Sequence, residues 1–209
     1  MRESLAVAAI ALTLMCGAEA QANTVCRYMY DPMLPGTEQC DSLVELEFIV
    51  AQPPDPQKMS LWCWAASLSM IFTAEGHPIS ADSIVLQNFK RLADAPSGEF
   101  VDFEANLNRV YRDVKGRRFQ TRARRIKNLR DASDALDDGM PILYTTGTHA
   151  AVQLSLTYQR SPFAAEVAKA GDIWDPEPGI GLRALSIQDM NRYKAAWKIE
   201  IKDLKQAVE

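Results

Sequence analysis

Cys63 is the residue that the sequence places best for nucleophilic chemistry. Residues 61–74 predict a helix, which Gly76 and Pro78 end. The first turn of a helix offers unpaired backbone N–H groups and the positive end of the helix dipole, so an anion such as a thiolate is favoured there. A cysteine that only packs in the core also suits this position, and the neighbouring residues must decide between the two interpretations.

Donors near Cys63 fit the stabilisation of a negatively charged substrate oxygen. Gln57 lies six residues upstream and offers a side-chain amide, and the Cys63 backbone N–H is a second donor. The indole N–H of Trp62 is a third, with simple packing as its alternative role. An amide and a helix-terminal N–H together form an oxyanion hole, which points to acyl transfer.

The N-terminus and the cysteine count predict export. The apolar run from Leu5 to Met15 is too short to span a bilayer, and Ala-x-Ala cleavage sites follow at residues 18–22. We therefore predict a signal peptide over residues 1–22 and a bacterial protein of the periplasm or medium. A lipid anchor on Cys16 is not expected, because the bulky Met15 precedes it. No other apolar run is long enough for a transmembrane segment.

Three cysteines remain in the predicted mature chain. Cys26 and Cys40 lie in a turn-rich stretch and are predicted to form a disulfide, because exposed thiols pair in an oxidising compartment. Cys63 is then the odd thiol, which is either reactive or buried.

The segment from Gln57 to Ser67, Gln-Lys-Met-Ser-Leu-Trp-Cys-Trp-Ala-Ala-Ser, resembles the nucleophile segment of the papain-like cysteine proteases. That family places a Gln six residues before a Cys-Trp-Ala that opens its central helix. Residues 60–62 are Ser-Leu-Trp where the papain subfamily has Cys-Gly-Ser, so the resemblance is closer to the compact bacterial branches, the secreted effector cysteine proteases and the double-glycine leader peptidases. It implies a papain-like α+β fold, with the nucleophile on the central helix of an N-terminal helical lobe packed on a C-terminal antiparallel sheet.

The resemblance also implies the partners of the thiol. His149 follows Gly147 and opens an apolar strand, as the general base does in that family, whereas His77 is predicted to be an exposed turn residue. Asp175 comes 26 residues after His149, and its Trp-Asp-Pro setting resembles that of the leader-peptidase branch. It is predicted to orient the imidazole, with Asp172 as a weaker rival.

The elements that must position these residues follow from hydrophobic periodicity. Helices are expected first and strands later, which favours one α+β domain over residues 23–209, with a segment 23–52 of no assigned role. Helices are predicted at 61–74, 81–92, 102–114 and 129–138, strands at 44–50, 141–146, 149–158, 171–174, 183–185 and 196–201, and a helical turn at 187–193.

A basic run interrupts this order. Residues 115–130 hold eight Lys or Arg and no acidic residue. The alternation over residues 118–122 predicts an edge strand guarded by its charges. The alternative is a docking surface for an acidic substrate, lipid head groups or a polyanion, formed by Arg117, Arg118, Arg122, Arg124 and Arg125. The net charge of −4 gives no reason to expect nucleic acid as a partner.

These residues predict a cysteine endopeptidase that acts on a peptide or protein, without cofactor or metal. Cys63 is the nucleophile, His149 the base, Asp175 the orienting acid and Gln57 an oxyanion donor. Two alternatives stay open: the same chemistry as an amidase or acyl transferase on cell-wall peptide or another acyl substrate, and a non-catalytic binding protein.

Overall fold

The computed structural model describes residues 24–44, 55–94, 100–185, 189 and 194–205. The predicted signal peptide lies outside these residues. So do the predicted strand 44–50, apart from Val44, and the predicted helical turn 187–193, apart from Asp189. No helix within the described ranges is long and apolar enough to cross a membrane.

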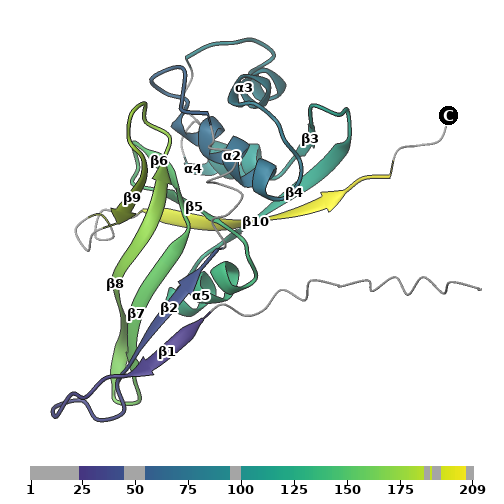
Figure 1. Cartoon of the computed structure of the whole chain (residues 1–209). Helices are drawn as coiled ribbons and strands as arrows, with labels where there is room; N and C mark the ends of the chain where they lie inside the picture. Colours follow the sequence, from purple (N-terminus) through teal and green to yellow (C-terminus); the bar gives the residue numbers. More distant parts are fainter. Residues whose placement is uncertain (1–23, 45–54, 95–99, 186–188, 190–193, 206–209) are drawn as a thin grey trace, which may run out of the picture.

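Ten antiparallel strands form one sheet in the described chain (Figure 1). Nine follow the order β1-β2-β7-β8-β6-β5-β10-β4-β3, and β9 pairs with β8 beside this path. Their bounds are β1 Val25–Tyr28, β2 Glu38–Leu43, β3 Val110–Arg112, β4 Arg118–Arg125, β5 Ile142–Thr145, β6 Ala150–Gln153, β7 Ser155–Ser161, β8 Ala164–Asp175, β9 Gly181–Leu185 and β10 Ala195–Asp203.

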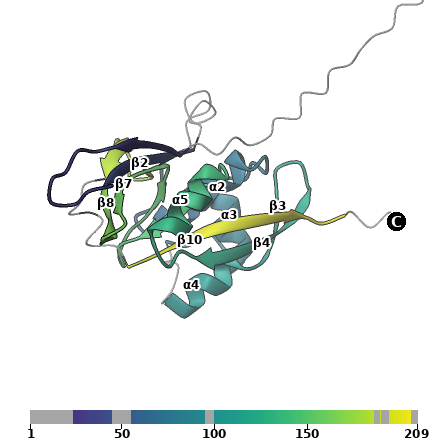
Figure 2. The same ribbon diagram turned by 90° about the horizontal axis from the view of Figure 1, so that it is seen from below.

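The described residues form four short helices: α2 Cys63–Ala74, α3 Ala81–Phe89, α4 Phe100–Leu107 and α5 Leu129–Asp137. Helix α2 is buried along most of its length and contacts β6, β5 and α3. In Figure 1, α2 and α3 lie above β10 while α5 lies below it, and Figure 2 shows the molecule from the α5 side. Two apolar clusters result, one around α2 and one around α5.

The predicted papain-like α+β fold, with its N-terminal helical lobe, is wrong. The structure is mostly antiparallel β, with a curled, half-barrel sheet and only short helices. Strands β1 and β2 precede the first described helix and join the later β7, while β3 and β4 lie between α4 and α5 in the sequence. Helices α2, α4 and α5 therefore pack onto one continuous sheet, and α3 packs against α2.

Pairing between strands explains the misassigned elements. The helix predicted at 102–114 ends at Leu107, because Val110–Arg112 pairs with β4. Residues 118–125 do form a strand, but β4 lies between β10 and β3 and is not the edge of the sheet. The strand predicted at 149–158 is divided between β6 and β7 around Leu154, and β8 begins well before the predicted 171–174.

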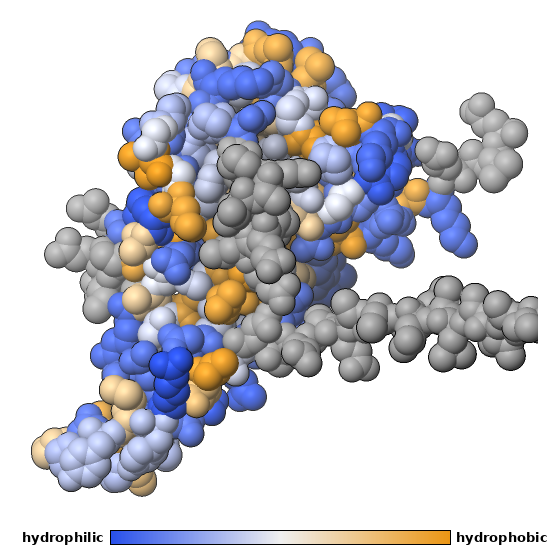
Figure 3. Space-filling model, viewed as in Figure 1, coloured by the Kyte–Doolittle hydropathy of each residue, from blue (hydrophilic) through white to orange (hydrophobic). Residues whose placement is uncertain are grey.

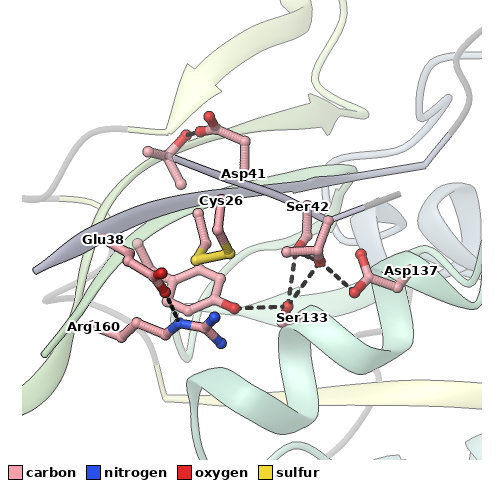
Figure 4. The surroundings of a disulfide bond; sticks show 11 residues. Cys26, Glu38, Asp41, Ser42, Ser133, Asp137 and Arg160 are labelled. Atoms are coloured by element: carbon pink, nitrogen blue, oxygen red, sulfur yellow. Dashed lines mark hydrogen bonds and ion pairs between the residues drawn. A yellow bond between two sulfur atoms is a disulfide. The ribbon is translucent and has the colours of Figure 1, made fainter. Parts of the chain in front are cut away.

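At the end of the sheet away from α2, a disulfide links β1 to β2, and a network of hydroxyl groups links β2 and β7 to α5 (Figure 4). The predicted Cys26–Cys40 disulfide is confirmed, and it links directly paired positions of β1 and β2. Ser42 on β2 lies 2.7 Å from the hydroxyl of Ser133 on α5, which in turn contacts Tyr158 on β7. The disulfide fits the predicted export, because such bonds persist in oxidising compartments.

Candidate active site

The start of α2 is held by a loop that follows α3. Cys63 is the first residue of the helix, two residues later than predicted, and Trp62 takes the capping position without a side-chain hydrogen bond. Ser60 does not cap the helix, because its hydroxyl donates to Asp94. Asp94 also accepts from the Leu61 N–H at 2.8 Å, so one carboxylate fixes the entry to the helix.

Cys63 is a free, buried thiol in this structure, with about 9% of its surface exposed. Its hydrogen bonding and its charge are among the causes that raise the pKa of His149. His149 directly precedes β6, at the end of a hairpin turn from β5 in which Gly147 has φ +96°. The Thr146 N–H donates to the His149 carbonyl and closes that turn. The turn therefore presents the imidazole toward the N-terminus of α2.

Asp175 occupies the other side of the imidazole. It ends β8, is 4% exposed, and its Oδ1 lies 2.8 Å from Nε2 of His149. Because Asp175 engages Nε2, Nδ1 is the ring nitrogen left to face Cys63. The sheet brings β6 and β8 together through the pairing of Val152 with Trp174.

Both members of the His149–Asp175 pair have shifted pKa values. The hydrogen bonds to Asp175 and to Cys63 raise the pKa of His149 from 6.5 to about 10, although burial opposes this. Burial raises the pKa of Asp175, but the hydrogen bonds from His149 and the Glu177 N–H and the charge of His149 lower it below the usual range of a carboxyl. The arrangement thus favours a protonated imidazole next to an ionised carboxylate.

Arg183 also contacts Asp175 and was not predicted as a site residue from the sequence. It belongs to β9, and its Nε lies 3.2 Å from Asp175 Oδ2, while the Glu177 N–H donates to Oδ1. Both carboxylate oxygens are therefore held, which fixes the acid relative to His149. The basic residue eight positions after Asp175 was a signal, but only the pairing of β9 with β8 brings it to the carboxylate.

The predicted rival of Asp175 is engaged elsewhere. Asp172 accepts from the Ser155 hydroxyl at 2.8 Å, and its N–H donates to the same hydroxyl. Gly171, beside it, allows β7 and β8 to approach, because a Cβ there would stand 2.5 Å from the Ser155 carbonyl oxygen. The geometry therefore associates His149 with Asp175 and not with Asp172.

Gln57 is anchored to the same part of the molecule. Its backbone N–H donates to the carbonyl of Pro176, the residue after Asp175, at 2.8 Å. Its side-chain Nε2 makes a long bond of 3.3 Å to the Ser60 carbonyl, and its Oε1 is buried without a partner. Trp62, the third predicted donor, is occupied, since its indole N–H donates to Ala93. Gln57 and the N–H of Cys63 thus remain the candidate oxyanion donors.

His77 differs from its prediction. It is 5% exposed and so is not an exposed turn residue. The turn after α2, where Gly76 has φ +80°, folds the ring inward onto Phe119, with ring centroids 4.4 Å apart. Its nitrogens face Asp113 at 3.7 Å and Asp203 at 3.4 Å. A turn flanked by glycine and proline does not indicate which way its side chain points, and the aromatic core decided it here.

The five arginines predicted as a docking patch do not share one face. Arg118, Arg122 and Arg124 alternate along the exposed side of β4. Arg125 has the opposite parity, and Arg117 is paired with Asp113 at 2.7 Å. The strand therefore divides the predicted patch into separate environments.

One group in the described chain brings metal-ligating atoms together, formed by Cys26, Glu38 and Cys40. Both sulfurs belong to the disulfide, which removes the thiolates that a soft metal would need. Comparison of the chain with protein-family models, with curated proteins and with solved structures finds no match. The geometry of the site is therefore the basis for a function.

Proposed function

We propose that this protein is a cysteine endopeptidase, in which Cys63 is the nucleophile, His149 the proton carrier and Asp175 the group that orients the imidazole. The observation that carries the proposal is the line of contacts from a free thiol at a helix start, through His149, to a buried Asp175 at 2.8 Å. The likeness of residues 57–67 to the nucleophile segment of papain-like cysteine proteases supports the role of the thiol. The proposal rests on this local geometry and not on the predicted fold.

In the first half of the reaction, the Cys63 thiolate attacks the carbonyl carbon of a peptide bond. The electrons of the C=O bond move onto the oxygen, which accepts hydrogen bonds from the Cys63 N–H and the Gln57 amide. His149 then gives its Nδ1 proton to the leaving amine as the C–N bond breaks. The products are a free amine and a thioester on Cys63.

In the second half, water attacks the thioester. The neutral imidazole takes a proton from the water at Nδ1, and the C–S bond breaks with return of the electron pair to sulfur. Asp175 stays ionised throughout, holding the Nε2–H and stabilising the imidazolium. The raised pKa of His149, about 10, supports an imidazolium that is present before substrate arrives.

A labelling experiment tests the nucleophile. The folded protein is incubated with an epoxysuccinyl cysteine-protease inhibitor, and the adduct is located by peptide mass mapping. We expect one adduct, on Cys63, and parallel loss of cleavage of an unfolded protein substrate. A Cys63→Ala variant is the control for non-specific alkylation. Turnover that persists after complete modification of Cys63 would contradict the proposal.

The same protein, incubated with peptide fragments of the cell wall and with acyl acceptors, separates an endopeptidase from an amidase or transferase. Cleavage within an unfolded polypeptide is the expected result. Activity restricted to cell-wall fragments, lost with Cys63→Ala, would retain the mechanism but replace the substrate class.

A further inference from the structure

Strands β3, β4 and β10 gather cations from three separate parts of the sequence on one exposed face. In an antiparallel sheet, directly paired residues point to the same side. Arg112 pairs with Arg118, and Arg124 pairs with Lys198. Alternation along the strands adds further members. The resulting basic face consists of Arg112, Arg118, Arg122, Arg124, Lys198 and Lys202.

Most of the charge on the basic face is uncompensated. Glu200 lies within it and is paired with Arg124. In the part of the chain that the structure describes, no ion pair engages Arg118, Arg122, Lys198 or Lys202. Since the whole chain has a net charge of −4, this concentration of cations is not a consequence of composition.

The basic face lies on the opposite side of the sheet from the nucleophile. Residues of the other parity, such as Phe119 and Ile199, are buried in the apolar cluster that contains α2. Figure 2 views the sheet from the α5 side, where β10 and β4 extend beyond α5. A partner on the basic face therefore leaves the thiol side of the molecule open.

We propose that the basic face docks the protein onto an anionic phospholipid surface. Side chains on one face of a sheet are spaced about 7 Å apart along each strand and about 5 Å apart between neighbouring strands. The cations therefore form a two-dimensional array. A bilayer presents its phosphates in two dimensions as well, and arginine binds phosphate oxygens with two parallel hydrogen bonds. The array holds no aromatic side chain on which the bases of a single-stranded nucleic acid would stack.

Vesicle sedimentation tests this docking. The folded protein is mixed with vesicles of equimolar phosphatidylglycerol and phosphatidylcholine, and in parallel with vesicles of pure phosphatidylcholine. We expect binding to the anionic vesicles alone, weakening as salt is raised. Each basic residue near such a surface contributes roughly fivefold in affinity, so Arg118→Gln with Arg122→Gln should weaken binding about 30-fold.

A matched variant controls for net charge. Arg27→Gln with Lys169→Gln removes two exposed cations from the other end of the sheet and should bind like the original protein. Lys198→Gln with Lys202→Gln serves as a second disruption, and thermal melting checks that every variant is folded. Equal binding to both vesicle types, no binding, or an equal effect of both charge-matched pairs would overturn the proposal. So would binding to a soluble polyanion through Arg118 and Arg122 without binding to vesicles.

Discussion

The two histidines of this protein occupy similar surroundings but differ in the chemistry available to them. His149 lies between a thiol and Asp175, with a 2.8 Å contact to the carboxylate and 27% of its side chain exposed. His77 lies between the carboxylates of Asp113 and Asp203, with 7% of its side chain exposed. Only His149 has a thiol beside it, and its ring is the more exposed of the two.

The carboxylates next to the two histidines, Asp113 and Asp175, also differ in their hydrogen-bond partners. Asp113 is held by Arg117, which donates at 2.7 Å, and by the N–H groups of Lys115 and Arg117. Burial raises its pKa, but these bonds lower it below the usual range of a carboxyl. At His149 the short bond of Asp175 goes to the imidazole itself. A histidine next to an aspartate therefore does not by itself indicate a catalytic site. The position of the thiol and the exposure of the ring distinguish the two regions.

The largest expected effect separates the two histidines directly. Cys63→Ala and His149→Ala should each abolish turnover, because the thiolate or its proton carrier is lost, whereas His77→Gln should leave kcat unchanged. Steady-state cleavage of a peptide substrate by folded variants measures this. Loss of activity in His77→Gln, with activity kept in His149→Ala, would reverse the assignment.

Gln57 tests whether the site stabilises an oxyanion. Gln57→Ala should lower kcat by about 10²–10³, the usual cost of losing one donor to a transition-state oxygen. KM should change little, because the oxyanion forms only after attack. Lys58→Ala, a change to the exposed neighbour that pairs with Asp82, is the matched control. An effect on KM alone would assign Gln57 to substrate binding.

The next largest loss of kcat is expected at Asp175, and it tests the choice between Asp175 and Asp172 as the orienting residue. Asp175→Ala should lower kcat about 10²-fold, because His149 keeps its chemistry but loses its orientation. Asp175→Asn should be milder, since an amide still accepts the Nε2–H bond. Asp172→Asn should affect stability more than rate, because Asp172 is bonded to Ser155. If Asp172→Asn proved the more damaging to kcat, the orienting residue would be misassigned.

The His77 region should reveal its role in stability. His77→Ala removes the ring stacked on the fully buried Phe119, and we expect a loss of about 1–3 kcal/mol in the free energy of unfolding. Urea unfolding followed by far-UV circular dichroism measures it. Arg91→Ala, at an exposed position, should change stability little. An unchanged free energy in His77→Ala would exclude a structural role for the ring.

The last prediction concerns pH. Because the folded-state pKa of His149 is raised from 6.5 to about 10, its interactions stabilise the fold fully below pH 6.5 and progressively less as pH rises toward 10. Wild type should therefore exceed His149→Gln in unfolding free energy most at pH 6, with the difference shrinking in alkali. A difference that grows with pH would mean that the imidazole is neutral in the folded protein.

The sequence alone identified four candidate site residues, Cys63, Gln57, His149 and Asp175. It also predicted the Cys26–Cys40 disulfide correctly. These predictions used local signals: a helix that begins near Cys63, a strand that begins after His149 and the odd number of cysteines. Such signals depend on neighbouring residues only, so they hold in whatever fold the chain adopts. The catalytic roles themselves remain predictions.

Only the tertiary structure decided the fold, the direction of His77 and the residues that support the site. Strand β2, Glu-Gln-Cys-Asp-Ser-Leu, has little β-branched or apolar content, and pairing with β1 and β7 makes it a strand. Asp94 lies 33 residues after Leu61, from whose N–H it accepts a hydrogen bond. Arg183 reaches Asp175 because β9 pairs with β8. The basic face likewise exists only because β10 pairs with β4. The pairings of β2 with β7 and of β10 with β4 join segments far apart in the chain, so no short window of sequence contains them. The segment that resembles papain-like proteases is local, and it therefore did not determine the sheet on which it packs.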